Sequence, residues 1–445
     1  MRGRWRRDET GELPILLDPA SSDEYEPVPL SPMVREARRR AWHDAADNAR
    51  RVGLSRRDFL RTSMGAATVL LALGGCSNDE KGGRSGGTFT VPTDAGVDRD
   101  TADAVFTGSD VPVIDAQAHL LEFDLSKPRS GSFFGSGFPQ ADCGAADPRD
   151  CFGVDRFIDA VFAKSETAAA VLSAVPAPDA FTGELSVEVM DQARRDVAQS
   201  VGGGRLLIHG LVAPTDKPLL AALDDMAVVA QRFRVEGWKA YTGSGPGWRL
   251  NDDVGRAVLQ KTIELGIPRI AIHKGISGSA PFASPADMGP AAKEFPAVQF
   301  AAYHSGWEPG VKEGAFTDAT ADRGTNRLVS SLRRAGVAPN TNVYAELGST
   351  WFNLMRSPDE AAHVLGKLLV AVGEDRVIWG TDSIWYGSPQ GQIDALRSFT
   401  ITAEFQERFG YPALTDEIKG KILARNVAHL YGLDLATIGK RPRPS

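Results

Sequence analysis

The chain has 445 residues, a formal net charge of −7 and 42% hydrophobic residues. This composition is typical of a globular protein, and the length allows one large domain preceded by a leader. We find no basic patch and no RNA-binding motif, so nucleic acid is not an expected partner.

A short apolar stretch near the N-terminus follows a pair of arginines. Residues 55–60 read SRRDFL, the uncharged residues 62–75 follow, and this stretch ends in Leu73-Gly74-Gly75-Cys76. It is shorter than the ~20 apolar residues that span a bilayer, so the pattern predicts a twin-arginine export signal rather than an anchor helix. The ending resembles the lipobox of bacterial lipoproteins, which implies cleavage before Cys76, lipidation of its thiol and a periplasmic or envelope location. The alternative is a buried helix with an ordinary cysteine.

These signals divide the chain into four parts. We expect an export leader over 1–76, a flexible tether over 77–110 rich in small polar residues, a catalytic domain over 111–435 and a tail over 436–445. Met33 is an alternative start that still leaves a complete signal. Cys143 and Cys151 lie eight residues apart, and in an oxidising compartment we prefer a disulfide over a metal pair or two free thiols.

Short apolar runs alternate with helical patterns through the rest of the chain. The runs are 111–116, 168–174, 204–211, 236–241, 268–273, 297–303, 341–347 and 376–381. Helical patterns cover 218–234, 253–265, 327–335 and 357–372. Eight such repeats predict an α/β protein of the (β/α)₈ TIM-barrel class. A doubly wound sheet would need a glycine-rich turn after its first strand, which the segment 115–119 is not. Residues 123–155 form a long insertion that we expect to cover the site as a lid.

Four polar residues stand at or just beyond the ends of these predicted strands. They are His119, His273, His304 and Asp382. Side chains at the C-terminal ends of barrel strands build the active site, so this pattern indicates an enzyme. The alternative is a structural role, in which the histidines bond to backbone carbonyls and the aspartate caps the next helix. His209 lies inside an apolar run, so we expect it in the core or behind the site.

The same residues resemble the amidohydrolase superfamily. The resemblance covers about residues 111 to 434 and lies with the amidohydrolase-related branch that includes aminocarboxymuconate-semialdehyde decarboxylase. It rests on Ile114-Asp115-x-x-x-His119, the histidine of the fifth strand, His304-Ser305-Gly306, Gly380-Thr381-Asp382 and the helix that ends at Gly432.

The resemblance implies a divalent metal, usually zinc, and its ligands. Carried over by position, these are Gln117, His119, His273 and Asp382, with His304 as the catalytic acid or base. The family has a histidine where this chain has Gln117, and an amide oxygen is a weaker ligand than imidazole. This departure leaves room for manganese or for no metal. A bound ion would lower the pKa of its water to ~7, and Asp382 could accept the proton.

Several neighbouring residues are candidates for substrate contacts. Lys239 near the fourth strand's end predicts a substrate-binding ammonium, with a metal-bridging carbamate or a structural ion pair as alternatives. Tyr241 and Trp385 are expected to wall the pocket, unless they only pack. Glu346 is expected to orient a histidine from behind or to pair with Lys239.

We therefore predict an exported metal-dependent hydrolase of a small organic substrate, anchored to the membrane only by lipid. The runner-up is a non-oxidative decarboxylase of an aromatic or unsaturated acid, which would need an arginine such as Arg129 or Arg249 in the pocket. A third hypothesis is a catalytically silent barrel lipoprotein that binds ligands, supported by Gln117 alone. Relatives implied by the resemblance are often dimers, so a homodimer is an expectation.

Overall fold

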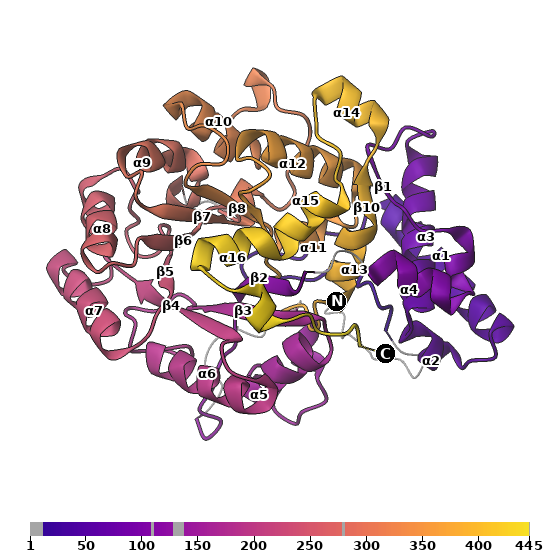
Figure 1. Cartoon of the computed structure of the whole chain (residues 1–445), viewed down its shortest axis with the longest axis horizontal. Coiled ribbons are helices and arrows are strands. Elements are labelled where there is room, and N and C mark those ends of the chain that lie inside the picture. Colours follow the sequence, from indigo (N-terminus) through magenta and orange to yellow (C-terminus); the bar gives the residue numbers. More distant parts are fainter. Residues whose placement is uncertain (1–11, 108–110, 128–137, 278–280, 445) are drawn as a thin grey trace.

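Eight parallel strands form the wall of a barrel in the computed structural model (Figure 1). The structure describes residues 12–107, 111–127, 138–277 and 281–444. The strands are β2 (Val113–Ala118), β3 (Thr167–Ser173), β4 (Leu206–Val212), β5 (Gly237–Ala240), β6 (Arg269–His273), β7 (Gln299–Tyr303), β8 (Val343–Glu346) and β9 (Val377–Ile378). They are paired in chain order, so the predicted (β/α)₈ class is confirmed, with each observed strand inside or within two residues of its predicted range.

The barrel closes between its first and last strands. A parallel bridge joins Ala118 to Ser383 just beyond β9. The amide N–H groups of Ala116 and His119 donate to the carbonyls of Trp379 (2.9 Å) and Ser383 (2.6 Å). These bonds satisfy the backbone at an edge that would otherwise be open.

Helices surround the wall and cover one end of it. The helices that follow the strands are α5 (Val154–Phe157), α6 (Val187–Val201), α7 (Leu219–Arg232), α8 (Asp253–Glu264), α9 (Met288–Glu294), α10 (Asn326–Ala335), α11 (Thr350–Leu354), α12 (Pro358–Ala371) and α13 (Gln390–Ser398). The C-terminal part adds α14 (Ala403–Phe409), α15 (Asp416–Gly420), α16 (Asn426–Tyr431) and α17 (Leu435–Ile438). Figure 1 shows α15 and α16 lying across the end of the barrel that faces the viewer.

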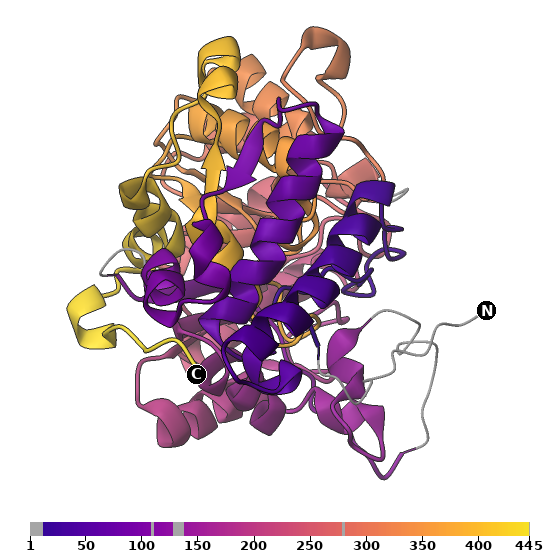
Figure 2. The ribbon, with the colours of Figure 1, turned by 90° about the vertical axis from the view of Figure 1, so that its right-hand side faces the viewer.

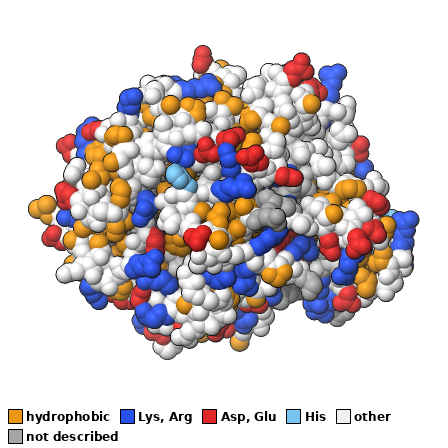
Figure 3. Space-filling view, in the orientation of Figure 1, with side chains coloured by type: hydrophobic (Ala, Val, Ile, Leu, Met, Phe, Trp, Pro, Cys, Tyr) orange, Lys and Arg blue, Asp and Glu red, His pale blue; other side chains and the backbone are white. Residues whose placement is uncertain are grey.

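Apolar side chains fill that end of the barrel. Ile114, Val171, Leu207 and Ile378 from the strands form one buried cluster with Val427 of α16. The predicted site residues therefore lie at the opposite, C-terminal end of the strands. On the face seen in Figure 3, acidic and basic side chains are interspersed, without one large patch of either sign.

The N-terminal residues fold into helices that pack on the flank of the barrel. They are α1 (Pro32–Arg51), α2 (Arg56–Leu60), α3 (Ser63–Glu80) and α4 (Arg99–Thr107). Helix α1 begins at Pro32 because the Ser31 side chain accepts the N–H of Val34, and proline suits the first helical turn. Its alanines at every fourth position are buried against α3, and Figure 2 shows the two helices side by side.

The described part of the expected flexible tether, residues 77–107, contains regular elements. Strand β1 (Gly87–Phe89) pairs antiparallel with β10 (Phe399–Ile401), next to α13. The Phe89 ring packs edge-on against Phe399, with ring centroids 5.6 Å apart. Composition predicts a linker because it counts small polar residues, whereas order here comes from the strand β1, its aromatic contact and the helix α4, which packs on α3.

The predicted apolar signal segment is the helix α3. Its residues from Ser63 to Leu70 are all buried, and Cys76 is 4% exposed in the middle of the helix's last turns. Among the described residues, no helix has both the length and the hydropathy needed to cross a bilayer. In the intact chain this segment is therefore packed against the rest of the protein.

The long insertion after β2 lies partly outside the described residues, since 128–137 are not among them. In its described part, Cys143 and Cys151 are joined in a disulfide. Phe138 packs on Trp385 with ring centroids 5.3 Å apart, and the N–H of Gln140 donates to the carbonyl of Trp385. The insertion thus contacts a residue at the site, while its movement as a lid stays a prediction.

Two glycines of α3 make a matched test of whether this helix belongs to the folded protein. A Cβ at Gly65 would lie 2.6 Å from the Phe59 carbonyl oxygen, whereas one at Gly75 meets nothing within 4 Å. We expect Gly65→Ala to destabilise the protein by about 1–3 kcal/mol through this clash. Gly75→Ala should stabilise it by roughly 0.5–1 kcal/mol, because alanine favours a helix. Denaturant unfolding of the purified protein measures both. Unchanged unfolding in both variants would mean that α3 is absent from the folded protein.

Candidate active site

Gln117, His119 and Asp382 meet where the barrel closes. Gln117 Nε2 donates to Asp382 Oδ1 (2.9 Å), and His119 Nε2 lies 3.2 Å from the same oxygen. His119 Nδ1 lies 2.7 Å from the Ser173 carbonyl oxygen. A carbonyl only accepts, so Nδ1 carries the proton and the lone pair of neutral His119 is on Nε2, facing the carboxylate. Gln117, expected as a weak ligand through its oxygen, here presents its nitrogen to Asp382.

Strand β2 is irregular at these residues. Asp115 pairs with Ala170 and Ala118 with Leu172, so β2 has one extra residue between them. Such a bulge re-aims side chains, which the strict alternation assumed from the sequence does not capture. The Asp115 carboxylate accepts the N–H groups of Gln117 (3.0 Å) and Thr381 (3.0 Å), and burial raises its pKa to about 7.

His304 stands on a strained turn directly after β7. The backbone angle φ is +66° at His304 and +51° at Ser305, and residues other than glycine rarely adopt such positive values. Glu346 holds this turn, because its carboxylate accepts the N–H groups of His304 (3.1 Å) and Gly348. Burial raises the pKa of Glu346 well above its ordinary value. Glu346 thus orients His304 through the backbone, without contacting its ring.

The His304 ring is fixed by one nitrogen and leaves the other open. Nδ1 lies 2.8 Å from the Gly348 carbonyl oxygen and is the donor, so the lone pair is on Nε2. That Nε2 is buried and has no hydrogen-bond partner among the described residues. Burial lowers the pKa of His304 to about 4, partly offset by the charge of Asp382. The ring is therefore neutral near pH 7.

His273 ends β6 and faces His304, with ring centroids 4.8 Å apart. The Tyr241 ring stacks on it at 5.4 Å, and Tyr241 is held by a hydrogen bond from its hydroxyl to the Ala174 carbonyl (3.0 Å). His273 Nδ1 also lacks a hydrogen-bond partner within the described chain. Burial lowers the pKa of His273 well below its ordinary value, with His304 adding to the effect.

Lys239 is a fully buried cation in the middle of the barrel. Its Nζ lies 3.9 Å from the Tyr303 ring centroid and 4.5 Å from that of Tyr241, and no hydrogen-bond partner is described for it. Burial lowers its pKa to about 8, and the carboxylates of Glu24 and Asp382 limit this fall. The expected ion pair with Glu346 is not a direct contact. Lys239 instead acts on the surrounding carboxylates through its charge.

One further residue, not predicted from the sequence, also enters the site. Glu24, from the segment before α1, places Oε1 3.4 Å from His273 Nδ1 and Oε2 3.9 Å from His304 Nε2. Burial raises its pKa to about 8, with Asp382 adding and Lys239 opposing. Its side chain is nonetheless 29% exposed, so it borders open space rather than a sealed core. We missed Glu24 because residues 1–76 were assigned to a leader.

The other predicted residues lie around this centre. Trp385 stacks on His119 with ring centroids 5.7 Å apart, as a wall of the pocket would. His209 is inside β4, bonded to Ser173 Oγ (3.0 Å) and to the Tyr431 hydroxyl (2.8 Å). It lies behind Ser173, whose carbonyl holds His119, and burial lowers its pKa to about 3.

Two glycines make room for this arrangement. A Cβ at Gly380 would lie 1.8 Å from Glu346 Oε1, and one at Gly348 would lie 2.5 Å from Gln117 Oε1. Asp382 and Ser349 have φ values of +58° and +54°, so three loops at this end of the barrel carry unusual backbone. Such strain is found at functional sites, where the surrounding structure maintains it.

The donor set fits a divalent cation. His119 Nε2 and Asp382 Oδ1 direct lone pairs to the same space, and His273 Nδ1 and His304 Nε2 are buried without donors. In both His119 and His304 the other ring nitrogen is committed to a carbonyl, the usual support of a metal-binding histidine. Among the described residues, Glu24, His273 and His304 bring their ligand atoms within 4.8 Å of one another.

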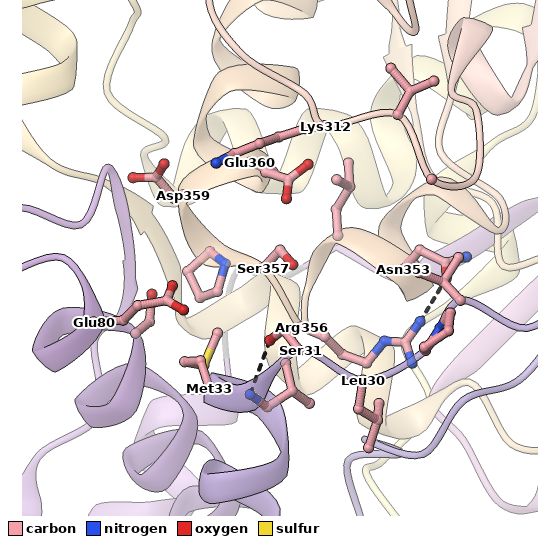
Figure 4. Close-up of a pocket in the computed structure, with 18 of the residues that line it drawn as sticks. Leu30, Ser31, Met33, Glu80, Lys312, Asn353, Arg356, Ser357, Asp359 and Glu360 are labelled. Atoms are coloured by element: carbon pink, nitrogen blue, oxygen red, sulfur yellow. Dashed lines mark hydrogen bonds between the residues drawn. The ribbon is translucent and has the colours of Figure 1, made fainter.

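A separate cavity of about 370 Å³ opens between the N-terminal helices and the barrel (Figure 4). Leu30 and Met33 line one side, and Trp307, Asn353 and Arg356 line the other. Figure 4 shows the Arg356 guanidinium next to Asn353, to which it donates. None of the predicted metal-binding residues lines this cavity, so it is distinct from the site.

Of the two arginines that would favour a decarboxylase, only Arg249 lies within the described residues. Arg129 lies outside the described residues. The Arg249 guanidinium lies over the Phe282 ring at 5.1 Å, and the backbone N–H of Arg249 donates to Asp252.

The chain is similar to several solved structures at low sequence identity. Among solved structures, 5-carboxyvanillate decarboxylase from Novosphingobium aromaticivorans, determined with bound manganese, is 15% identical, with a TM-score of 0.45 over 73% of this chain and 97% of that one. A 2,6-dihydroxybenzoate decarboxylase from Rhizobium is 11% identical (TM-score 0.43, 72% and 99% covered). A candidate 2-pyrone-4,6-dicarboxylic acid hydrolase from Pseudomonas putida is 16% identical (TM-score 0.42, 73% and 99% covered).

No curated protein matches the chain significantly. The model of the family described as Amidohydrolase matches residues 114–433, which is most of the chain and includes every strand-end residue of the site. The chain therefore belongs to the Amidohydrolase family of enzymes.

Proposed function

We propose that the protein is a metal-dependent hydrolase of a small organic substrate such as a lactone, ester or amide. The observation that carries this proposal is a set of donor atoms at the C-terminal end of the barrel. His119 Nε2 lies 3.2 Å from Asp382 Oδ1, and His273 Nδ1 and His304 Nε2 are buried without hydrogen-bond partners among the described residues. Nitrogen and carboxylate donors suit zinc or manganese, and we place zinc first. Membership of the aminocarboxymuconate-semialdehyde decarboxylase-like branch is part of the same proposal.

Each residue has a role that its contacts allow. His119, His273 and Asp382 would hold the ion, which when bound supplies an activated water and polarises a substrate carbonyl. His304 donates through Nδ1 and keeps the lone pair on Nε2, which has no hydrogen-bond partner among the described residues, so it can take a proton from the reacting water or return one to the leaving group. Lys239 provides positive charge for an anionic substrate or intermediate.

We place the hydrolase before the decarboxylase alternative. A decarboxylase would use a cationic clamp for its carboxylate; Arg249 contacts Phe282 and Asp252 instead, which leaves Lys239 as the candidate clamp among the described residues. A silent binding barrel fits less well, since it would have no use for a buried histidine on a strained turn. Export by the twin-arginine pattern, lipidation at Cys76 and a homodimer stay predictions.

Metal content tests the first half of this proposal. The full chain, purified without added metal and reconstituted with zinc or manganese, should hold about one equivalent by elemental mass spectrometry. His273→Ala should weaken binding by at least about 100-fold, the upper end of losses seen for supporting residues alone. His429→Ala, on the exposed face of α16, is the control and should bind normally. Absence of metal from the reconstituted wild type would overturn the assignment.

Turnover tests the second half. A panel of lactones, esters and amides, followed by chromatography, should show hydrolysis that His304→Gln slows by about 10²–10⁴-fold, the usual contribution of a general acid or base. Aromatic and unsaturated acids, followed by CO₂ release, are the parallel panel. Release of CO₂ without hydrolysis would select the decarboxylase, and equal rates in His304→Gln would remove His304 from the chemistry.

A further inference from the structure

Residues 12–31, which we call the N-terminal arm, bring Glu24 to the catalytic end of the barrel. The arm is anchored on both sides of Glu24. Arg356 donates to the Asp18 carbonyl (3.0 Å), and the Tyr25 hydroxyl bonds to the hydroxyl of Tyr386 (2.8 Å) and to Asn353 Nδ2 (2.8 Å). These partners belong to the barrel, so the arm is fixed to it by specific contacts.

The Tyr25 anchor reaches the catalytic residues directly. Tyr386, which bonds to Tyr25, also bonds to Ser349 Oγ (2.6 Å), and Ser349 donates to Asp382 Oδ2. Tyr25 packs edge-on against Trp307, with ring centroids 5.7 Å apart. A continuous set of hydrogen bonds therefore runs from the arm to Asp382.

The contact of Glu24 with His273 has the spacing of two ligands on one ion. Oε1 and Nδ1 are 3.4 Å apart, too far for a charge-assisted hydrogen bond of about 2.7–2.9 Å. Two ligands each about 2.1 Å from one ion in a tetrahedral arrangement lie roughly 3.4 Å apart. The 3.2 Å between His119 Nε2 and Asp382 Oδ1 is close to the same spacing.

The chain needs such a ligand because of Gln117. The amide nitrogen of Gln117 donates to Asp382, so its oxygen is not directed at the lone pairs of His119 and Asp382. One ligand position implied by the family is thereby lost, while a carboxylate arrives beside His273 from another part of the chain.

We propose that Glu24 is a metal-binding residue of this site and replaces the ligand that Gln117 does not provide. This inference rests on the proposed metal-dependent function. The N-terminal arm is then part of the catalytic domain, because it supplies a metal ligand that does not come from any strand of the barrel. It also means that cleavage before Cys76 would remove a ligand together with residues 63–75 of the helix α3.

Metal affinity of matched variants tests the proposal without a substrate. Titration calorimetry with zinc chloride and with manganese chloride compares the full-length wild type with Glu24→Gln, which keeps the shape of the side chain. The control is Glu26→Gln, which changes an exposed carboxylate of the same arm. We expect Glu24→Gln to bind at least about tenfold more weakly, and Glu26→Gln to bind as the wild type does.

The outcomes separate the two claims. Equal affinity in the wild type and Glu24→Gln overturns the role of Glu24 and leaves the metal site standing. A wild type that binds no metal overturns the proposed function itself. Thermal unfolding of the metal-free proteins should give the same midpoint for all three, so that a loss of binding is not a loss of fold.

Processing of the chain offers an independent test. Expressed in a bacterium with a twin-arginine system, the metal-loaded protein should have an intact mass that includes residue 24. A metal-loaded protein that begins at Cys76 would overturn the proposal, because it binds metal without Glu24.

Whether the hydrogen bonds of Tyr25 hold the N-terminal arm against the barrel can be measured separately. Tyr25→Phe removes the hydroxyl that bonds to Tyr386 and Asn353. We expect hydrogen exchange of residues 20–26 to become roughly 5- to 30-fold faster, the effect of losing one or two buried hydrogen bonds. Metal affinity should fall with it, because Glu24 is then less well placed. Glu26→Gln serves again as the control, and unchanged exchange in Tyr25→Phe would show that these bonds do not hold the arm.

Discussion

Closure of the barrel between its first and last strands is the constraint on which the site depends. Asp115 on β2 accepts the N–H of Thr381, and the N–H of Asp382 donates to the Gln117 carbonyl (2.9 Å). These bonds set His119 and Asp382 3.2 Å apart although 262 residues separate them in the sequence. The positive φ of Asp382 is tolerated because both neighbouring strands hold it. A barrel open at this edge would leave the two lone pairs without a common space.

Buried charge is the second constraint. Glu346 and Asp382 lie deep in the barrel, Glu24 borders them with a partly exposed side chain, and Lys239 is the fully buried cation that acts on all three. Burial disfavours each charge separately, which is why the pKa values of Glu24 and Lys239 move toward each other. Glu346 differs from the other two carboxylates, because backbone N–H groups occupy its oxygens and leave none for a ligand. Glu24 Oε2 accepts the Ser22 hydroxyl (3.0 Å), and its Oε1 lies beside His273, whose Nδ1 has no hydrogen-bond partner among the described residues.

The barrel could be predicted from the sequence because its signals are local. Apolar runs of strand length alternate with helical patterns, and polar residues at the run ends must converge once the strands are parallel. The details of β2 could not be predicted, because the bulge between Asp115 and Ala118 depends on pairing with β3. The orientation of Gln117 depends in turn on Asp382, at the other end of the barrel domain. Glu24 could not be predicted for a different reason. A twin-arginine pattern followed by an apolar stretch looks the same in sequence whether the segment is an export signal or is packed against the domain.

The apolar stretch illustrates how one composition serves two structures. An export signal and a buried helix both need a run of small and apolar residues without charge, as in α3 from Ser63 to Cys76. What separates them is the partner surface, here the alanine face of α1 and the strand β1. The decisive residues are therefore outside the stretch. The arm before α1 crosses to the catalytic end, and its Tyr25 completes a hydrogen-bond network with Tyr386 and Asn353.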